Sequence, residues 1–310
     1  MAELRVGTSQ EAAYLADLVE AGLLIECEVP GVYGRNATFE EVRTGVDDLV
    51  SRHAALDGAE QLRFPPVLPR RQLERAGYLR SFPHLAGSVF GFSGSEREAA
   101  ELSARADAHA DWSDLQVQTD LVLTPAACYP VYPAIAKRGP LPPGGVTVDA
   151  GGAYVFRSEP SGDPARLQMF HQREIVRIGE PEAVGEWRDA WRDRAIGLLR
   201  ALGLAAELDV ATDPFFGRRG RMLATSQREQ ALKFEVLVPI ASPSPTAVAS
   251  FNYHQDHFAS AYDVRLAGGG VAHTACLGFG LERVALALLR AHGLEPHAWP
   301  DAVREELWGA

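Results

Sequence analysis

The stretch HTACLGFGLERVALALLRAHG, residues 273–293, predicts a strand, a glycine turn and a helix. The helix has a clear core stripe, because apolar residues recur at helical spacing at Leu281, Val284, Ala285, Leu288 and Leu289. Gly293 is a natural terminator for this helix. The stripe explains the helix as part of a core, but it leaves Cys276 in the strand and Arg283 in the first helical turn unexplained.

Arg283 stands at the end of the helix where a positive charge is unfavourable. An arginine there costs roughly 0.3–1 kcal/mol against the helix dipole unless an anion or a carboxylate compensates. Helix N-termini that follow glycines are also sites where anions bind. The residues alone therefore leave two interpretations of Arg283, an anion site and simple packing of the turn.

The three cysteines, Cys27, Cys128 and Cys276, lie far apart and form neither a disulfide framework nor a CxxC clip. A free cysteine in a strand is most often a small buried hydrophobe. A second interpretation combines Cys128 and Cys276 with Glu174 as a three-ligand zinc site that has an open fourth position. The competing ligands near Cys276 are His254, His257 and His273.

A predicted hairpin carries a second set of polar side chains. In AYVFRSE, residues 153–159, strand alternation puts Val155, Arg157 and Glu159 on one side. The turn PSGDPAR reverses the chain, and the returning strand places on one face Gln168, Phe170, Gln172 and Glu174. An arginine, an aromatic ring and carboxylates on one surface suit a nucleotide. The alternative is a set of cross-strand ion pairs on a half-solvated hairpin.

Two further charged stretches have weaker patterns. In LKFEVLV, Lys233 and Glu235 share one face of a strand, which taken alone predicts a solvent-facing side. FFGRRGRMLATSQR, residues 215–228, predicts either a solvated arginine-rich loop or a local basic patch. The arginines concerned are Arg218, Arg219, Arg221 and Arg228.

Composition sets the broad class. The chain has 310 residues, of which 46% are hydrophobic, enough for one large domain with an extensive core. No apolar run approaches the roughly 18 residues of a membrane span, and the N-terminus lacks a signal-peptide pattern, so we expect a cytoplasmic protein without membrane contact. The formal net charge of −11 argues against wrapping a nucleic acid.

Helices are expected at 10–23, started by Ser9, and at 37–56, with Thr38 as N-cap and Glu41 three residues on. Shorter helices are expected at 70–76 and 95–110, and a strand and turn at 23–34. From Leu115 onward strands dominate, at 115–126, 152–159, 167–180, 231–241, 247–265 and 271–280. Helices interrupt them only at about 182–202 and 281–292, and 138–152 is expected to be a loop rich in proline and glycine. This order predicts an α+β fold with a largely antiparallel sheet flanked by helices.

In this order the segments resemble the catalytic core of class II aminoacyl-tRNA synthetases. LRFPPVLPRRQL, residues 62–73, resembles the first motif, a proline-containing strand and helix at the dimer interface. Residues 156–180 resemble the arginine hairpin of the second motif, and CLGFGLERVALALL, residues 276–289, the third. The match covers roughly residues 60–293 and implies a homodimer. The glycine loops of Rossmann and P-loop nucleotide binders are absent.

Within class II, KFEVLVPIASPSPTAVASFN, residues 233–252, and the His-Thr before Cys276 resemble zinc-dependent seryl-tRNA synthetases. That resemblance implies zinc held by Cys128, Glu174 and Cys276, with its free position taking the amino group of the amino acid. Residues 1–58 are too short for the long helical tRNA-binding arm of seryl enzymes. We expect them to form a short helical and strand segment packed on a catalytic domain spanning 59–310.

A chain of this kind resembles the amino acid:[carrier protein] ligases, which activate glycine or alanine with ATP and load the phosphopantetheine thiol of a carrier protein. The resemblance implies that Arg157 contacts the α-phosphate, Glu159 the adenine amine and Phe170 the base. Arg283 would clamp the γ-phosphate or stack on the base, and Glu174 and Asn252 would hold the amino acid. The rest of the site for ATP and Mg²⁺ would comprise Arg166, Leu167, Lys233, Glu235, Ala247, Val248, Ala249 and Ser250.

A carrier protein usually presents an acidic helix, so an acidic ligase needs a local basic surface for docking. Our hypothesis for this surface is Arg218, Arg219 and Arg221. Two alternatives stay open. One is tRNA aminoacylation of the seryl type, which the net charge and the short N-terminal segment argue against, and the other is a regulatory protein without catalysis.

Overall fold

The computed structural model describes residues 7–242 and 244–309. Its central element is a mixed sheet whose neighbouring strands pair antiparallel, except that β3 and β7 are parallel. Across the sheet the strands are β3 (Glu60–Leu62), β7 (Val146–Phe156), β8 (Met169–Gly179), β12 (His273–Gly280), β11 (Thr246–Gln255), β10 (Lys233–Val238) and β9 (Glu207–Val210). The predicted α+β class with a largely antiparallel sheet is confirmed.

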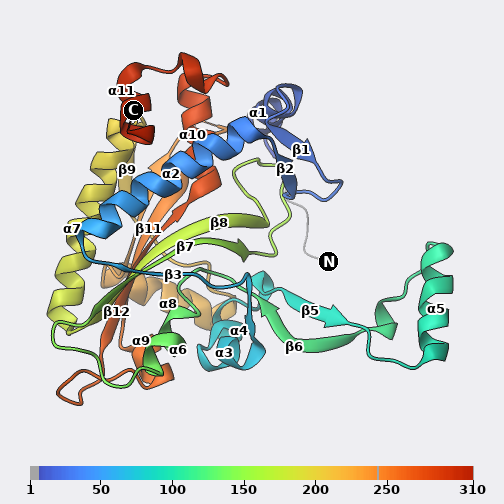
Figure 1. Ribbon diagram of the computed structural model, residues 1–310, viewed down its shortest axis with the longest axis horizontal. Coiled ribbons are helices and arrows are strands. Elements are labelled where there is room, and N and C mark those ends of the chain that lie inside the picture. Colours follow the sequence, from blue (N-terminus) through green and yellow to red (C-terminus); the bar gives the residue numbers. More distant parts are fainter. Residues whose placement is uncertain (1–6, 243, 310) are drawn as a thin grey trace.

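Helices cover both faces of this sheet (Figure 1). One face shares a core with α1 (Ser9–Glu20), α2 (Ala37–Leu56), α7 (Pro181–Ala201), α10 (Leu281–His292) and α11 (Asp301–Trp308). The other face shares a core with α3 (Arg70–Arg75), α4 (Tyr78–Ser81), α6 (Val131–Ala136) and α9 (His257–Tyr262). Because both faces are covered, the central strand β8 is buried over most of its length.

Side-chain alternation along β8 divides its residues between the two cores. Ile175 belongs to the core with α2, whereas Val176 and Ile178 belong to the core with α9. Glu174 therefore faces the second core, and its neighbour Arg173 faces α2, where it pairs with Asp47. The sheet thus has one face that packs against long helices and one face that carries Glu174.

Smaller elements complete the fold. A hairpin of β1 (Leu24–Glu26) and β2 (Tyr33–Arg35) joins α1 to α2. A three-stranded sheet of β4 (Val67–Pro69), β6 (Val117–Leu123) and β5 (Ser88–Gly91) extends away from the body with α5 (Glu96–Asp107) near its tip (Figure 1). Helix α8 (Gly217–Glu229) precedes β10, and 3₁₀ turns lie at Pro83–Leu85, Ser113–Leu115 and Pro296–Ala298. Among the described residues no helix is both long and apolar enough to cross a membrane.

Two expected helix starts were wrong in detail. The N-cap of α2 is Asn36, whose side chain accepts a hydrogen bond from the amide of Phe39, so the helix begins before Thr38. The N-cap of α1 is Thr8, not Ser9, and it forms a capping box with Glu11. For α2 the residue just outside the periodic pattern is the stronger capping residue, whereas for α1 the position of Glu11 three residues after Thr8 sets the start.

Several expected boundaries were also wrong. The predicted loop at 138–152 ends early, because β7 begins at Val146 and continues through a bulge at Gly151 and Gly152. The predicted strand at 247–265 stops at Gln255 and is followed by α9. Helices α6, α8 and α9 also interrupt the strands, in addition to the two expected interruptions. The division of the chain at residue 58 stays a prediction, and the core with α2 includes residues from both sides of that point.

Candidate active site

The two buried cysteines and Glu174 meet on the second face of the sheet. One ligand atom from each of Cys128, Glu174 and Cys276 lies within 4.8 Å of the others, and all three residues are buried. They come from the loop before α6, from β8 and from β12. The Cys128 amide donates a hydrogen bond to Glu174 Oε2, and Cys276 Sγ lies 3.6 Å from Glu174 Oε1. The structure therefore brings together the three predicted metal ligands.

The surroundings of this group do not favour free thiolates. Burial raises the pKa of the Cys128 thiol well above its usual range, and the nearby Cys276 and Glu174 add to the effect. Burial also raises the pKa of Glu174. A cluster of two thiols and a carboxylate is costly to charge without a cation, and thiolate and carboxylate donors are ones that zinc takes.

The competing histidines have other contacts. His254 Nε2 lies 3.6 Å from Cys276 Sγ, but its Nδ1 is 3.1 Å from the hydroxyl of Thr274. Burial lowers the pKa of His254 to about 4, so this ring is neutral at neutral pH. His257 contacts the carbonyl of Ala76 and His273 contacts the hydroxyl of Tyr253. In the part of the chain that the structure describes, the three-residue ligand group contains no histidine.

The ligand group opens into a cavity of about 400 Å³. Its wall also includes Arg157, Lys233, Ser250 and Asn252, to which the resemblance gives a role in binding ATP or the amino acid. Asn252 lies next to Cys276 in the sheet, with Nδ2 3.9 Å from Sγ, and its buried Oδ1 has no hydrogen-bond partner among the described residues. The wall of this cavity therefore combines the possible metal ligands with two cationic side chains, Arg157 and Lys233.

Three of the predicted arginines gather beside this cavity. Burial, together with the charges of Arg157 and Arg166, lowers the pKa of Arg283 to about 10. Arg283 donates to the carbonyl oxygens of Ala165 and Ala247 at 2.7 and 2.9 Å. The buried Nε of Arg166 has no hydrogen-bond partner among the described residues. The same Nε lies 3.6 Å from Asp163 Oδ2. Three arginines this close together are an arrangement that suits a polyanion.

The hairpin aligns much as predicted. Val155 pairs with Phe170, and the Arg157 guanidinium lies 6.0 Å from the centre of the Phe170 ring. Arg157 and Glu159 themselves lie beyond the end of β7, where the amide of Glu159 donates to the carbonyl of Arg157. Leu167 is buried in the same loop as Arg166. The residues that line the cavity do not include Glu159, Arg166, Leu167 or Phe170, nor do they include Glu235, Ala247, Val248, Ala249 or Arg283.

The face of β10 that carries Lys233 and Glu235 is not a solvent face, which corrects the prediction from the pattern alone. Lys233 is buried, and its Nζ lies 2.7 Å from Asp213 and 2.9 Å from Glu235. On the neighbouring strand β11, Val248 and Ala249 are buried while Ala247 and Ser250 are partly exposed. Lys233 of β10 and Asp213 of the loop after β9 therefore lie in the cavity wall, and Glu235 pairs with the lysine without lining the cavity.

The arginine-rich stretch is a helix, not a loop. Arg218, Arg219 and Arg221 lie near the start of α8 and are exposed. Four other residues of α8 and its end line the cavity, namely Leu223, Ser226, Gln227 and Gln230. The basic side chains thus stand on a helix that forms part of the cavity wall.

Two residues of the site were given no role from the sequence. Asp213 ties α8 to β10, because it bonds both Lys233 and the side chain of Gln227. Its stretch, ATDPFFG, has no spacing that marks it. Gln172 accepts from the amide of Ala127 and lines the cavity; strand alternation had placed it correctly beside Phe170 and Glu174 without giving it a role.

Comparison with solved structures identifies the fold class. No known protein-family model matches the sequence. The structure superposes with a TM-score of 0.80 and 21% identity on the seryl-tRNA synthetase of M. kandleri, solved with an A. aeolicus tRNASec, covering 96% of this chain and 61% of that one. It also matches the ATP complex of the Pyrococcus horikoshii seryl-tRNA synthetase, with a TM-score of 0.69 and 15% identity over 95% and 62% of the two chains. The fold is that of the class II aminoacyl-tRNA synthetases.

Sequence comparison identifies the family. Amino acid–[acyl-carrier-protein] ligase 1 of Bradyrhizobium diazoefficiens is 49% identical over 278 residues, 89% of this chain and 85% of the relative. Ligase 2 of the same organism is 48% identical over 295 residues, 95% and 86% of the two chains. The type-2 serine–tRNA ligase of Methanopyrus kandleri is 26% identical, and the chain spans 54% of its length. The chain belongs to the amino acid–[acyl-carrier-protein] ligases, which are enzymes of the ligase class.

Proposed function

We propose that the protein activates glycine or alanine with ATP as the aminoacyl-adenylate and transfers it to the phosphopantetheine thiol of a carrier protein. One observation carries the proposal: a cavity of about 400 Å³ has a possible metal-ligand group and Arg157 in its wall, with Arg166 and Arg283 close by. An amino acid and a polyphosphate would therefore meet in one place. The names of the two relatives near 50% identity support the joining of an amino acid to an acyl-carrier protein.

The arginines suit the first half of the reaction. The carboxylate of the amino acid attacks the α-phosphorus of ATP, the bond to the β-phosphate oxygen breaks, and diphosphate leaves. Arg157, Arg166 and Arg283 would neutralise the charge on the phosphates, which relieves their mutual repulsion. Phe170 would stack on the adenine that Glu159 holds by its amine, with Leu167 beside the nucleotide.

The strands β10 and β11 would complete the nucleotide site. Lys233 pairs with Glu235 and would hold its carboxylate in place. The carboxylate would then bind the Mg²⁺ that accompanies ATP. Ala247, Val248, Ala249 and Ser250 would form the wall along the nucleotide, and the Ala247 carbonyl already accepts from Arg283. This part of the proposal follows from the position of these residues next to Arg283.

Zinc fits the ligand group on chemical grounds. Cys128, Glu174 and Cys276 supply two sulfur donors and one carboxylate, converge within 4.8 Å and are costly to charge without a cation. Bound there, zinc would take the α-amine of the amino acid. Asn252, whose Oδ1 is unpartnered among the described residues, would hold the same substrate together with Glu174.

For the second half we propose that the carrier thiol attacks the mixed anhydride, forming a thioester and releasing AMP. The acidic carrier would dock on Arg218, Arg219 and Arg221, because α8 carries them at its surface and also lines the cavity. A homodimer, a cytoplasmic location and the absence of tRNA as a partner stay predictions.

The decisive experiment incubates the protein with ATP, Mg²⁺ and labelled glycine, alanine or serine, and follows exchange of diphosphate into ATP. Carrier protein or tRNA is then added, and the labelled product is identified. Exchange with glycine or alanine and a labelled carrier are expected. A labelled tRNA would favour the seryl-type alternative, and no exchange with any amino acid would overturn both enzymatic readings in favour of a regulatory protein.

A further inference from the structure

The hairpin of β1 and β2 lies against the loop that joins β7 to β8. Its carbonyl at Gly31 accepts a hydrogen bond from the amide of Gln168 at 2.8 Å. The Gln168 side chain in turn donates to the carbonyl of Pro30 at 2.8 Å. Gln168 directly follows Arg166 and Leu167, two residues of the proposed nucleotide site. The hairpin therefore holds the backbone at the very place where that loop reaches the site.

The contact is too close for a side chain at Gly31. Its φ of +79° lies in the left-handed region, and a Cβ there would stand 3.1 Å from the carbonyl oxygen of Arg166. It would also stand 3.3 Å from Cγ of Gln168. The hairpin turn thus packs directly on the backbone of the loop, and glycine permits the approach.

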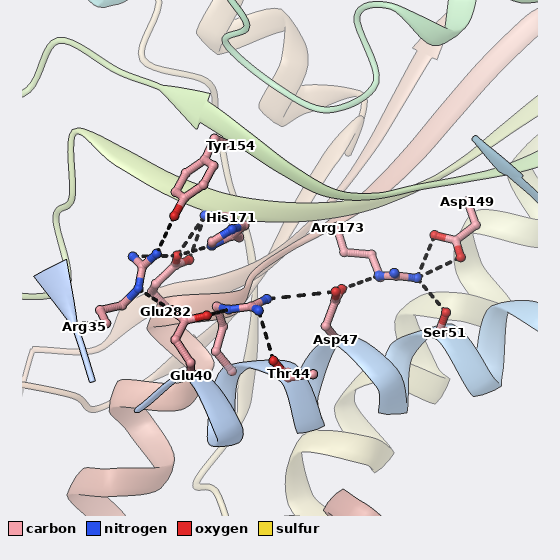
Figure 2. A network of polar contacts seen from close by, with 11 residues as sticks. Arg35, Glu40, Thr44, Asp47, Ser51, Asp149, Tyr154, His171, Arg173 and Glu282 are labelled. Carbon is pink, nitrogen blue, oxygen red and sulfur yellow. Dashed lines mark hydrogen bonds and ion pairs between the residues drawn. The ribbon is translucent and has the colours of Figure 1, made fainter. Parts of the chain in front are cut away.

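A second link starts from the other end of the hairpin. Arg35 lies 3.0 Å from Glu282, and it donates to the Tyr154 hydroxyl at 2.8 Å (Figure 2). The side chains of Arg35 and Glu282 are 9% and 1% exposed. Glu282 also accepts from the backbone amide of His171 and contacts His171 Nδ1 at 2.7 Å (Figure 2). One buried ion pair therefore joins the hairpin to both α10 and β8.

The residues at the far end of these contacts are neighbours of the proposed ATP ligands. Glu282 directly precedes Arg283 in the first turn of α10, and His171 directly follows Phe170 on β8. A buried carboxylate that is bonded both to a backbone amide and to side chains has little freedom to move. Fixing Glu282 against His171 and Arg35 therefore fixes the relative position of Arg283 and Phe170.

We propose that the β1–β2 hairpin is a positioning element of the nucleotide site, with Arg35 as its positioning residue. Arg35 holds the first turn of α10 against β8, and Gly31 holds the loop at Arg166. The hairpin touches none of the reacting groups itself. Its function is to set the spacing between Arg166, Phe170 and Arg283. This inference rests on the proposed function, since it assumes that these three residues surround ATP.

The test measures ATP affinity by calorimetry with Mg²⁺ in the wild type and in Arg35→Gln, Gly31→Ala and Gln168→Leu. The full chain is used throughout. Because misplacement of about 1 Å can cost a hundredfold in a preorganised site, we expect ATP binding about tenfold weaker in the first two variants. The third variant removes only the side-chain bond to Pro30, so a smaller loss is expected. The KM for the amino acid should not change in any of them.

Asp47→Asn is the matched control. It breaks an ion pair between α2 and Arg173 of β8, which resembles the Arg35 link but faces away from the cavity. Thermal unfolding is measured for every variant, so that a loss of stability common to all four can be separated from a loss of ATP affinity. Gln168→Leu lies at the periphery and keeps the test available if Arg35→Gln does not fold.

The outcomes separate the two proposals. Weaker ATP binding in the hairpin variants, with unchanged affinity in Asp47→Asn, supports the positioning role. Unchanged affinity in folded hairpin variants, or an equal loss in Asp47→Asn, overturns it. Wild-type protein that binds ATP but catalyses no exchange overturns the proposed function alone, and wild-type protein that binds no ATP overturns both.

Discussion

Arg283 is an arginine in an unfavourable place. It lies at the start of a helix, its charge is largely desolvated, and Arg157 and Arg166 repel it, which together lower its pKa to about 10. Such a residue lowers the stability of the protein in the absence of an anion. Natural proteins retain such costs mainly where function requires them.

Arg283→Met should therefore affect activity and stability in opposite directions. Since one preorganised charge contact can be worth about a hundredfold or more in rate, we expect amino acid-dependent diphosphate exchange to fall by at least that factor. The melting temperature should stay equal or rise, because a buried repulsive charge is gone. Arg290→Met, at the exposed end of the same helix, is the control: exchange should not change, and the melting temperature should fall slightly, because this charge suits the helix C-terminus and lies over the Tyr14 ring. A large loss of stability in Arg283→Met would contradict this account.

The metal-ligand group makes a separate prediction. Purified wild-type protein should contain about one zinc per chain, while Cys276→Ala and Cys128→Ala should lose affinity by more than about a hundredfold. Metal content is measured by elemental analysis after dialysis, so no activity is needed. The exposed Cys27 provides the control, and Cys27→Ala should keep its zinc. Full zinc occupancy in Cys276→Ala would exclude this cysteine as a ligand.

At the residue scale, strand alternation predicted the shared face of Phe170, Gln172 and Glu174, since a strand has only two faces. The residues alone left the meeting of Cys128 with Glu174 as one of two interpretations, and only the resemblance favoured it, because no spacing relates residues on separate elements. Asp213 was missed for the same reason. Its partners, Lys233 and Gln227, become neighbours only when α8 folds back on β10.

Among the elements, α8 differs most from its prediction. Its arginines and small residues are typical of a loop. The side of the helix that faces the cavity has few apolar residues, so hydrophobic periodicity gave no helical signal. In the structure Gln227 bonds to Asp213, and Asp213 pairs with Lys233, which fixes the helix to β10. Long-range polar contacts of this kind cannot be predicted from local sequence.

The position of α8 leads to a prediction about the carrier. Reversing Arg218, Arg219 and Arg221 to glutamate should raise the KM for the carrier by about tenfold or more, because charge complementarity sets the encounter rate. Amino acid-dependent exchange should not change, since these side chains are exposed and do not line the cavity. Reversal of Arg97 and Arg105 on α5 is the control. Equal losses of loading and exchange would refute a docking role.

Over the whole molecule, ion pairs of very different burial hold the layers together. Arg173 is 3% exposed and lies 2.8 Å from Asp149, which is 1% exposed, so that α2, β7 and β8 meet in one buried network (Figure 2). The pair of Arg138 and Glu60 is about half exposed, at 45% and 49%. Composition predicted a large core, but nothing in it indicated that charged residues would be buried between the layers.

Truncating the carboxylate of each pair should distinguish the buried ion pair from the exposed one. Asp149→Ala leaves a buried guanidinium with fewer partners and should lower the free energy of unfolding by about 3 kcal/mol. Glu60→Ala removes an exposed carboxylate and should lower it by less than about 1 kcal/mol. Chemical denaturation with urea measures both. Similar losses in the two variants would show that burial does not govern the strength of these pairs.

Strand β8 places Arg173 and Glu174 on opposite sides of the sheet, one against α2 and the other in the cavity. A slip of one residue in its pairing would exchange the two, putting a guanidinium among the thiols and a carboxylate beside Asp47. Misregistered chains should therefore be unable to retain zinc. After refolding, the metal content of a sample would count the molecules whose β8 register is correct, so that a spectroscopic zinc titration would serve as an assay of folding fidelity.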